Sequence, residues 1–125
     1  MGKLIFFVDD DKMILNLLEY TFHNRKQYVV KTFYSGEQCI ENLHLQPNLI
    51  VLDHVLSAPG KDLMNGLETL KKIHKLSPDV PVIILTGHGD DELLSEFMEN
   101  GASRFLTKDD YFIDSLIETM EQILK

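Results

Sequence analysis

The chain has 125 residues, of which 44% are hydrophobic and 26% are charged, so it is long enough to bury one core of ordinary globular composition. Its formal net charge of −8 argues against a nucleic-acid-binding protein, which needs a basic surface to neutralise phosphates. The single Cys39 excludes an internal disulfide, and no apolar run approaches the roughly 20 residues of a membrane helix. We therefore expect a cytoplasmic protein that contacts neither membranes nor nucleic acid directly.

Five short apolar runs, rich in β-branched and aromatic residues, predict five β-strands. In chain order the runs are Leu4 to Val8, Tyr28 to Phe33, Leu49 to Leu52, Val80 to Leu85 and Arg104 to Leu106. The first, third and fourth show almost no alternation of polar and apolar residues. Such runs are typical of strands buried on both faces, as in a parallel sheet covered by helices.

Helical patterns fill the gaps between these strands. Four apolar stripes mark helices: Met13, Ile14, Leu17, Leu18 and Phe22; Leu67, Leu70 and Ile73; Leu93, Leu94, Phe97 and Met98; Leu116, Ile117, Met120 and Ile123. A weaker pattern from Ser35 to Leu45 predicts one more helix. Five strand–helix alternations imply right-handed crossovers and a doubly wound α/β sandwich, and we expect one domain over residues 1–125 because no linker interrupts it.

Polar residues follow four of the predicted strands where each strand ends. They are Asp9-Asp10-Asp11, Asp53, Thr86-Gly87-His88-Gly89 and Thr107-Lys108. The carboxyl ends of the strands form the ligand-binding edge of such a sheet, so we expect these residues to converge. Two carboxylates about 4 Å apart repel by roughly 4 kcal/mol at an effective dielectric of about 20, which favours a bound cation. Mg²⁺ suits the set, because it takes one or two carboxylates together with waters and a phosphate oxygen.

A carboxylate beside such a metal can attack phosphorus and form an aspartyl phosphate. Asp53 is the candidate, because a buried strand leads straight into it at the ligand edge. The Thr86 hydroxyl can donate to a phosphoryl oxygen, and Lys108 supplies positive charge. Singly, Asp10 or Asp11 can be a helix cap. Thr86 can simply end a strand, and Lys108 can be solvated. Their joint occurrence at four strand ends favours a phosphorylation site.

Four motifs at these strand ends carry a resemblance to a known family. They are Phe7-Val8-Asp9-Asp10-Asp11, Leu52-Asp53, Ile84-Leu85-Thr86-Gly87 and Gly101-Ala102-Ser103-Arg104-Phe105-Leu106-Thr107-Lys108. Over essentially its whole length the chain resembles the receiver domain of two-component response regulators. The resemblance implies a flavodoxin-like (βα)5 sandwich, with a parallel sheet of strand order 2-1-3-4-5 and helices on both faces.

The resemblance also implies roles for individual residues. Asp53 becomes the phosphoacceptor, and Thr86 and Lys108 contact the phosphoryl oxygens. The Mg²⁺ ligands become Asp9, Asp10, Asp53 and the backbone carbonyl of Val55. Phe105 takes the place of an aromatic residue that moves inward as Thr86 turns toward the phosphate. Phe105 is therefore either a working switch residue or a static core residue.

In the family, a sensor histidine kinase or a histidine phosphotransfer protein supplies the phosphoryl group. The resemblance thus implies a phosphorylation-dependent switch rather than an enzyme in the usual sense, since a receiver catalyses only its own Mg²⁺-dependent phosphorylation and slow dephosphorylation. Its signal passes to a downstream protein target or an output domain. The family's usual output surface is the fourth helix, fifth strand and fifth helix, and a homodimer through these two helices is a further arrangement.

Three departures from the family pattern bear on these expectations. The first is the loop after Asp53, which is longer because Asn65-Gly66 lies five residues later than usual. Pro59-Gly60 is a turn signal within this loop. The extra length either serves partner selection or is neutral. Asp109 replaces a proline that follows a cis peptide, and we expect a trans bond because a non-proline cis bond costs about 2.5–4 kcal/mol. The third departure concerns Val55 and His88, which flank the site: apolar Val55 cannot orient an attacking water, so we expect a long-lived phosphoryl group.

Two other functions compete with this interpretation. A haloacid-dehalogenase-like phosphatase also carries an Asp-x-Asp motif like that of Asp9-Asp10-Asp11, but the chain is short for that fold and Asp53 would have no role. A receiver-like scaffold would bind partners without phosphorylation. Phosphorylation of His54 is disfavoured, because neighbours on a strand point to opposite faces. We expect Cys39 to be a small buried residue rather than a redox sensor.

Overall fold

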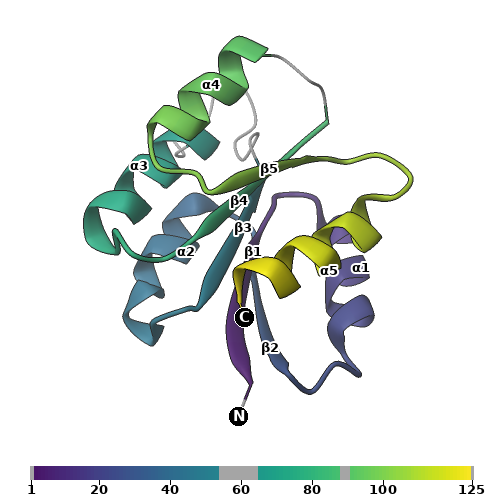
Figure 1. Ribbon diagram of the computed structural model, residues 1–125. Helices are drawn as coiled ribbons and strands as arrows, with labels where there is room; N and C mark the ends of the chain where they lie inside the picture. The colour runs from purple at the N-terminus through teal and green to yellow at the C-terminus, as the bar shows by residue number, and fades with distance from the viewer. Residues whose placement is uncertain (1, 54–64, 88–90, 125) are drawn as a thin grey trace.

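A parallel sheet forms the centre of the computed structural model, which describes residues 2–53, 65–87 and 91–124. Within them the strands are β1 (Lys3–Val8), β2 (Tyr28–Phe33), β3 (Leu49–Asp53), β4 (Val82–Thr86) and β5 (Arg104–Thr107). The helices are α1 (Lys12–Phe22), α2 (Gly36–Glu41), the 3-10 helix η1 (Leu43–Leu45), α3 (Gly66–Leu76), α4 (Asp91–Glu99) and α5 (Phe112–Ile123). The strand order is β2-β1-β3-β4-β5, which confirms the predicted topology (Figure 1).

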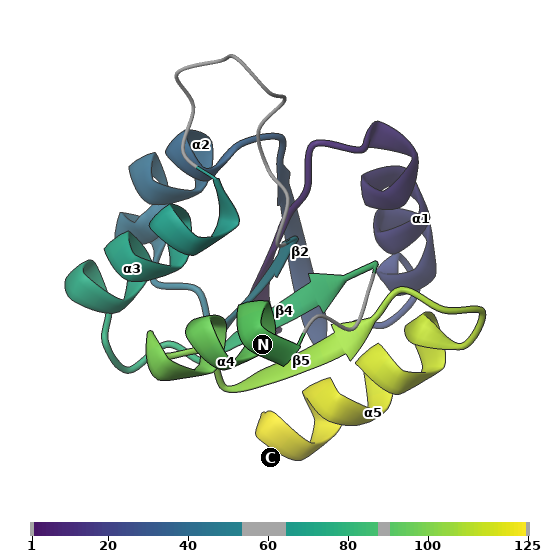
Figure 2. The same ribbon diagram turned by 90° about the horizontal axis from the view of Figure 1, so that it is seen from above.

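Helices cover both faces of this sheet, with α1 and α5 on one side and α2, α3 and α4 on the other (Figure 2). Neighbouring Phe6 and Phe7 on β1 point to opposite faces, and both are fully buried. Phe6 packs in a core with Leu70 of α3 and Phe97 of α4, and Phe7 packs in a second core that includes Leu116 of α5. Burial on both faces explains why the central strands read as continuous apolar runs.

The strands extend further toward the predicted ligand edge than the apolar runs suggested. The last residues of β3, β4 and β5 are Asp53, Thr86 and Thr107. At its other end β4 begins at Val82, two residues later than predicted. The Val80 N–H donates to the Ser77 carbonyl in a turn, and Pro81 has no N–H with which to extend the strand. The functional side chains therefore lie on the ends of rigid strands.

The helix predicted from Ser35 to Leu45 is interrupted. Ser35 accepts a hydrogen bond from the Gln38 N–H and caps α2, but α2 ends at Glu41, and η1 follows. Between them Asn42 leaves the helical conformation, and its side-chain amide donates to the Gln38 carbonyl at 2.7 Å. Asparagine favours such local bonds over continuing a helix, which accounts for the break.

The buried face of α1 differs from the predicted stripe. Leu15, Leu18 and Phe22 are buried, whereas Met13 is 80% exposed and Leu17 is 43% exposed. Apolar residues surround much of this helix, so their spacing did not determine which side meets the sheet.

No helix in the described part of the chain is long and apolar enough to cross a membrane.

Candidate functional site

The carboxyl ends of four strands meet at one edge of the sheet. Val8 of β1 pairs with Leu52 of β3, and Asp53 pairs with Leu85 of β4. Thr86 of β4 pairs with Thr107 of β5. This parallel register brings the residues that end or follow these strands to the same level, as the sequence predicted.

Three carboxylates converge at this edge. One oxygen each from Asp9, Asp10 and Asp53 lies within 4.8 Å of the others. Asp9 is only 2% exposed and Asp53 only 5%, whereas Asp10 is exposed to solvent. The site is thus a cluster of three carboxylates, of which only Asp10 is exposed to solvent.

Lys108 bridges the two buried carboxylates. Its Nζ lies 3.0 Å from Asp9 Oδ2 and 3.0 Å from Asp53 Oδ1. The Lys108 backbone N–H donates to the Thr86 carbonyl at 2.8 Å, so pairing with β4 fixes where the side chain starts. With Asp10 included, three carboxylates and one ammonium leave two negative charges, which matches a divalent cation.

Burial and charge set the protonation of these groups. Burial, followed by the nearby Asp9 carboxylate, raises the pKa of Asp53 to about 6, and Lys108 opposes this rise. Burial disfavours the charged form of Lys108, but Asp53 and Asp9 outweigh it and raise the pKa of the ammonium. Partial burial and then Asp9 raise the pKa of Asp10. Near neutral pH Asp53 is therefore largely ionised, and Lys108 is positively charged.

The three consecutive aspartates have different local roles. Asp9 Oδ1 accepts a hydrogen bond from the Asp11 N–H at 2.9 Å, which orients the Asp9 carboxylate. Asp11 Oδ1 accepts from the Met13 N–H at 2.9 Å, so Asp11 is the N-cap of α1. The capping explanation thus applies to Asp11, and Asp10 belongs to the acidic cluster.

Thr86 and Phe105 lie on neighbouring strands near this cluster. Thr86 is fully buried at the end of β4, one strand away from Asp53. Phe105 pairs with Ile84 in the β4–β5 ladder, but its side chain is 44% exposed. Phe105 therefore does not lie in the core, and its role as a switch residue stays a prediction.

Several predictions fall outside the described residues, namely those on His54, Val55, the longer loop around Pro59-Gly60 and His88. At Lys108-Asp109 the expected trans bond is confirmed, because the described residues contain no cis peptide. Cys39 is fully buried, which confirms it as a small buried residue, and burial raises the pKa of its thiol to about 12.

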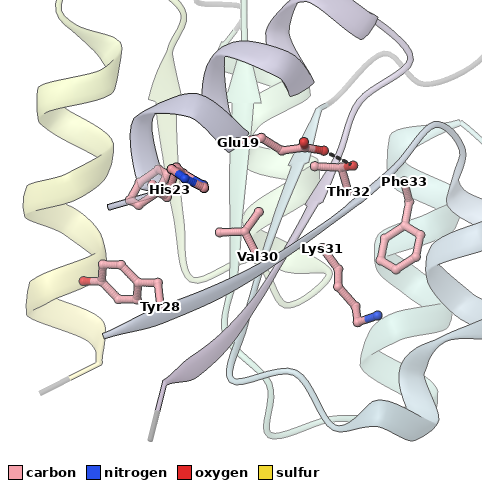
Figure 3. A pocket seen from close by; sticks show the side chains of 8 residues that line it. Glu19, His23, Tyr28, Val30, Lys31, Thr32 and Phe33 are labelled. Atoms are coloured by element: carbon pink, nitrogen blue, oxygen red, sulfur yellow. Dashed lines mark hydrogen bonds between the residues drawn. The ribbon is translucent and has the colours of Figure 1, made fainter. Parts of the chain in front are cut away.

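The sequence did not indicate a polar cavity beside the outermost strand β2. A cavity of about 470 Å³ lies between α1 and β2 (Figure 3). Glu19, His23 and Lys31 line it, and Glu19 accepts a hydrogen bond from the Thr32 hydroxyl at 2.7 Å. Its lining residues come from two elements without a recognisable motif. It adjoins the outermost strand β2 and shares no residue with the acidic cluster.

Comparison with known proteins identifies the family. A family model for the response regulator receiver domain matches residues 5–120. The chain belongs to this receiver family. Membership decides against the dehalogenase-like phosphatase, in which Asp53 had no role.

Relatives and solved structures agree with this assignment. The receiver is 32% identical to the Bacillus subtilis transcriptional regulatory protein YdfI over 100% of the chain and 56% of YdfI. It is 34% identical to Escherichia coli ZraR over 96% of the chain but only 26% of ZraR, so it spans about a quarter to a half of these relatives. The BeF3-activated DrrB receiver domain superposes with a TM-score of 0.84 at 31% identity, covering 99% and 98% of the two chains. A CheY-like receiver from Methanospirillum hungatei gives 0.81 at 28% identity, covering 98% and 94%.

Proposed function

We propose that this receiver, extending over residues 1–125, is a phosphorylation-dependent switch in which Asp53 accepts a phosphoryl group. The observation that carries the proposal is the position of the Asp53 carboxylate: it ends a buried strand, lies in the acidic cluster and contacts Lys108 at 3.0 Å. A nucleophile held in this way is oriented before reaction, and the lysine neutralises charge on the transferring group.

The residues present fit Mg²⁺. The donor set consists of carboxylate oxygens, and the cluster with Lys108 leaves two uncompensated negative charges. We propose that Asp9, Asp10 and Asp53 hold the ion, with the Val55 carbonyl as the further ligand implied by the family. When bound, Mg²⁺ neutralises charge on the phosphoryl oxygens.

The phosphodonor in this proposal is a phosphohistidine of a sensor histidine kinase or a histidine phosphotransfer protein. An Asp53 carboxylate oxygen bonds to phosphorus as the bond from phosphorus to the donor nitrogen breaks, and an acyl phosphate results. Lys108 and the Thr86 hydroxyl contact the phosphoryl oxygens. The receiver performs this reaction and its slow hydrolysis only on itself. The curated relatives are transcriptional regulators, which act where DNA is, so we propose a cytoplasmic location.

Signal output follows from the same arrangement. Thr86 moves toward the phosphoryl group, and exposed Phe105 on the neighbouring strand changes its position, so the surface around β5 changes its affinity for a protein target or an output domain. The exposure of Phe105 supports this role, because a side chain packed in the core would not be available to a partner.

Phosphorylation with a small donor tests the proposal. The protein is incubated with Mg²⁺ and phosphoramidate or acetyl phosphate, and intact mass is followed for the wild type, Asp53→Asn and Asp11→Asn. Asp11→Asn is the matched control, because it removes one negative charge from the same segment and retains a good helix cap. We expect one phosphoryl group on the wild type and on Asp11→Asn, and none on Asp53→Asn.

Labelling that survives Asp53→Asn would overturn the proposal. Since some receivers do not react with small donors, beryllofluoride binding is measured alongside. A wild type that neither reacts nor binds beryllofluoride in Mg²⁺ would identify the chain as the unphosphorylated scaffold.

A further inference from the structure

One outer edge of the sheet is formed by β2, which pairs with β1 on one side only (Figure 1). The Asp9 N–H donates to the Phe33 carbonyl, so the odd-numbered residues of β2 turn their backbone groups toward β1. The direction of these groups alternates along a strand, so Val30 and Thr32 turn theirs away from the sheet. Their N–H and carbonyl groups form the outer edge of β2.

The outward N–H groups at the two ends of this edge already have partners. The Tyr28 N–H donates to a carbonyl of the preceding turn at 3.0 Å, and the Tyr34 N–H donates to Gln38 Oε1 at 2.8 Å. Between them, no described residue accepts from the N–H of Val30 or Thr32. Unpaired backbone groups in a row along a strand are what an added strand binds.

The cavity between α1 and β2 lies along this open part of the edge. Its lining includes Val30 and Thr32 on one side of the strand and Lys31 and Phe33 on the other (Figure 3). Because it touches side chains of both faces, the cavity lies beside the strand rather than above the sheet. Phe22 of α1 gives it an apolar wall on the α1 side. An added strand would therefore find room for its side chains as well as for its backbone.

The edge is basic, although the chain as a whole is acidic. Residues 20–36 contain Arg25, Lys26 and Lys31 but no aspartate or glutamate, in a chain of net charge −8. These three basic residues make no ion pair with any described residue. Lys31 is exposed on one side of β2, whereas the carboxylate of Glu19 lies on the opposite, α1 side. Negative charge from a partner is therefore favoured on the Lys31 side alone.

We propose that the outer edge of β2 binds an extended segment of a partner protein in which acidic residues alternate with β-branched residues. The segment adds a strand to the sheet, and its backbone bonds to the outward groups of Val30 and Thr32. Its β-branched side chains enter the cavity beside α1, and its acidic side chains meet Lys31. The alternation follows because successive side chains of a strand point to opposite faces. No residue of this edge belongs to the acidic cluster, so the binding does not depend on phosphorylation.

A second copy of this chain fits the same edge less well. In a two-fold interface the two edges pair antiparallel, and only the outward residues Val30 and Thr32 can exchange backbone bonds. Pairing Val30 with Thr32 of the copy places Lys31 directly opposite its counterpart. Pairing either residue with itself places the two lysines diagonally, still within reach of each other. Like charges in these positions disfavour the pair, and lysine on an edge strand commonly prevents self-association.

Four synthetic peptides test the proposal. Three share one set of valine and threonine residues and carry glutamate, glutamine or lysine at the alternating positions; the fourth is the glutamate peptide with its central amides N-methylated. Binding to the full chain is measured by fluorescence anisotropy at low and high salt. We expect the glutamate peptide to bind at least about tenfold more tightly than the glutamine peptide and to weaken with salt, and we expect no binding of the lysine or N-methylated peptides.

Amide hydrogen exchange locates the binding surface. In the free protein we expect fast exchange at Val30 and Thr32 and slow exchange at Val29 and Lys31, whose N–H groups bond to β1. The glutamate peptide should slow exchange at Val30 and Thr32 at least about tenfold. Attraction to the basic side chains alone would leave these two amides unchanged.

Two variants separate charge from backbone pairing. Lys31→Glu should weaken the glutamate peptide at least about tenfold and allow the lysine peptide to bind, whereas Lys72→Glu on exposed α3 is the matched control with less than about twofold effect. Val30→Pro removes an outward N–H without removing a bond to β1, so it should weaken the glutamate and glutamine peptides alike. Melting temperatures show whether the variants are folded, and Lys31→Glu, an exposed change, carries the test by itself if Val30→Pro is not.

Several outcomes would overturn the inference: no binding of the glutamate peptide, equal binding of the N-methylated peptide, unchanged exchange at Val30 and Thr32, or equal loss in Lys72→Glu. A wild-type dimer that Val30→Pro dissociates would identify a second copy as the occupant and would also overturn it. Phosphorylation of Asp53 is measured separately by mass, so failure of peptide binding leaves the proposed function intact, and failure of phosphorylation leaves the binding edge intact.

Discussion

At the scale of single residues, Asp53 combines two opposing influences. Its burial disfavours the ionised carboxylate, while Lys108 at 3.0 Å stabilises it. Burial and Asp9 prevail, so the folded protein holds a proton on Asp53 more tightly than the unfolded chain does. The folded state therefore carries an ionised Asp53 at a cost in stability, as is common for residues placed for reaction rather than for stability.

This cost predicts how stability depends on pH. With a pKa of about 6 in the folded state, the contribution of Asp53 to stability is fully present below its unfolded pKa of about 3.9 and is lost as the pH rises through 6. In EDTA, Asp53→Asn should thus raise the free energy of unfolding by about 1–2 kcal/mol at pH 7.5, and this gain should shrink toward pH 4.5. Urea unfolding at both pH values measures it. Asp11→Asn is the control, and a gain that does not vary with pH would contradict the expectation.

At the scale of elements, the junction between α4 and β5 determines where the fifth strand starts. The Ala102 N–H donates to the Phe97 carbonyl, and the Gly101 N–H donates to the Met98 carbonyl, which is the bonding pattern of a Schellman cap. Gly101 has a φ of 108°, which favours glycine. This cap reverses the chain into the strand that leads to Phe105 and Lys108.

Replacing Gly101 with alanine should therefore destabilise the fold. A Cβ at this position is strained by the positive φ and would lie 2.6 Å from His74 Nδ1, so we expect a loss of about 1–2 kcal/mol. Adding His74→Ala to this variant should restore only the part of the free energy of unfolding that the steric contact with the imidazole removes. Thermal or urea unfolding measures both, with exposed Ser95→Ala on α4 as the control. An alanine variant as stable as the wild type would show that the cap is not needed.

At the scale of the whole molecule, the acidic cluster joins segments that are far apart in the sequence. The Lys108–Asp9 contact spans 99 positions, and Asp53 ends β3, which lies between these two residues in the sequence. A cation bound by these carboxylates binds only the folded arrangement, so ion binding and folding are coupled.

Magnesium should accordingly stabilise the fold. At about ten times its dissociation constant, Mg²⁺ should add about 1.4 kcal/mol to the free energy of unfolding, and Asp9→Asn should remove most of this gain. Melting temperatures with and without Mg²⁺ measure it. Exposed Asp110→Asn is the control, because it removes the same charge outside the cluster. Equal stabilisation of both variants would indicate a general salt effect.

The sequence by itself determined the sheet and which residues lie at the carboxyl ends of its strands. The two-sided burial of β1, β3 and β4 required continuous apolar runs, and parallel strands necessarily bring their carboxyl ends together. Asp9, Asp10, Asp53, Thr86 and Lys108 were identified because each follows or ends such a strand. These features depend on local patterns and on topology, and both can be predicted from the sequence.

Only the tertiary structure decided how these parts contact one another. It showed that Lys108 bridges Asp9 and Asp53, that Asp11 rather than Asp10 caps α1, and that Met13 lies outside the core. It also showed that exposed Phe105 borders a groove formed with α4. The physical reason is that each of these facts depends on distances between elements, which packing sets and hydrophobic periodicity leaves undetermined.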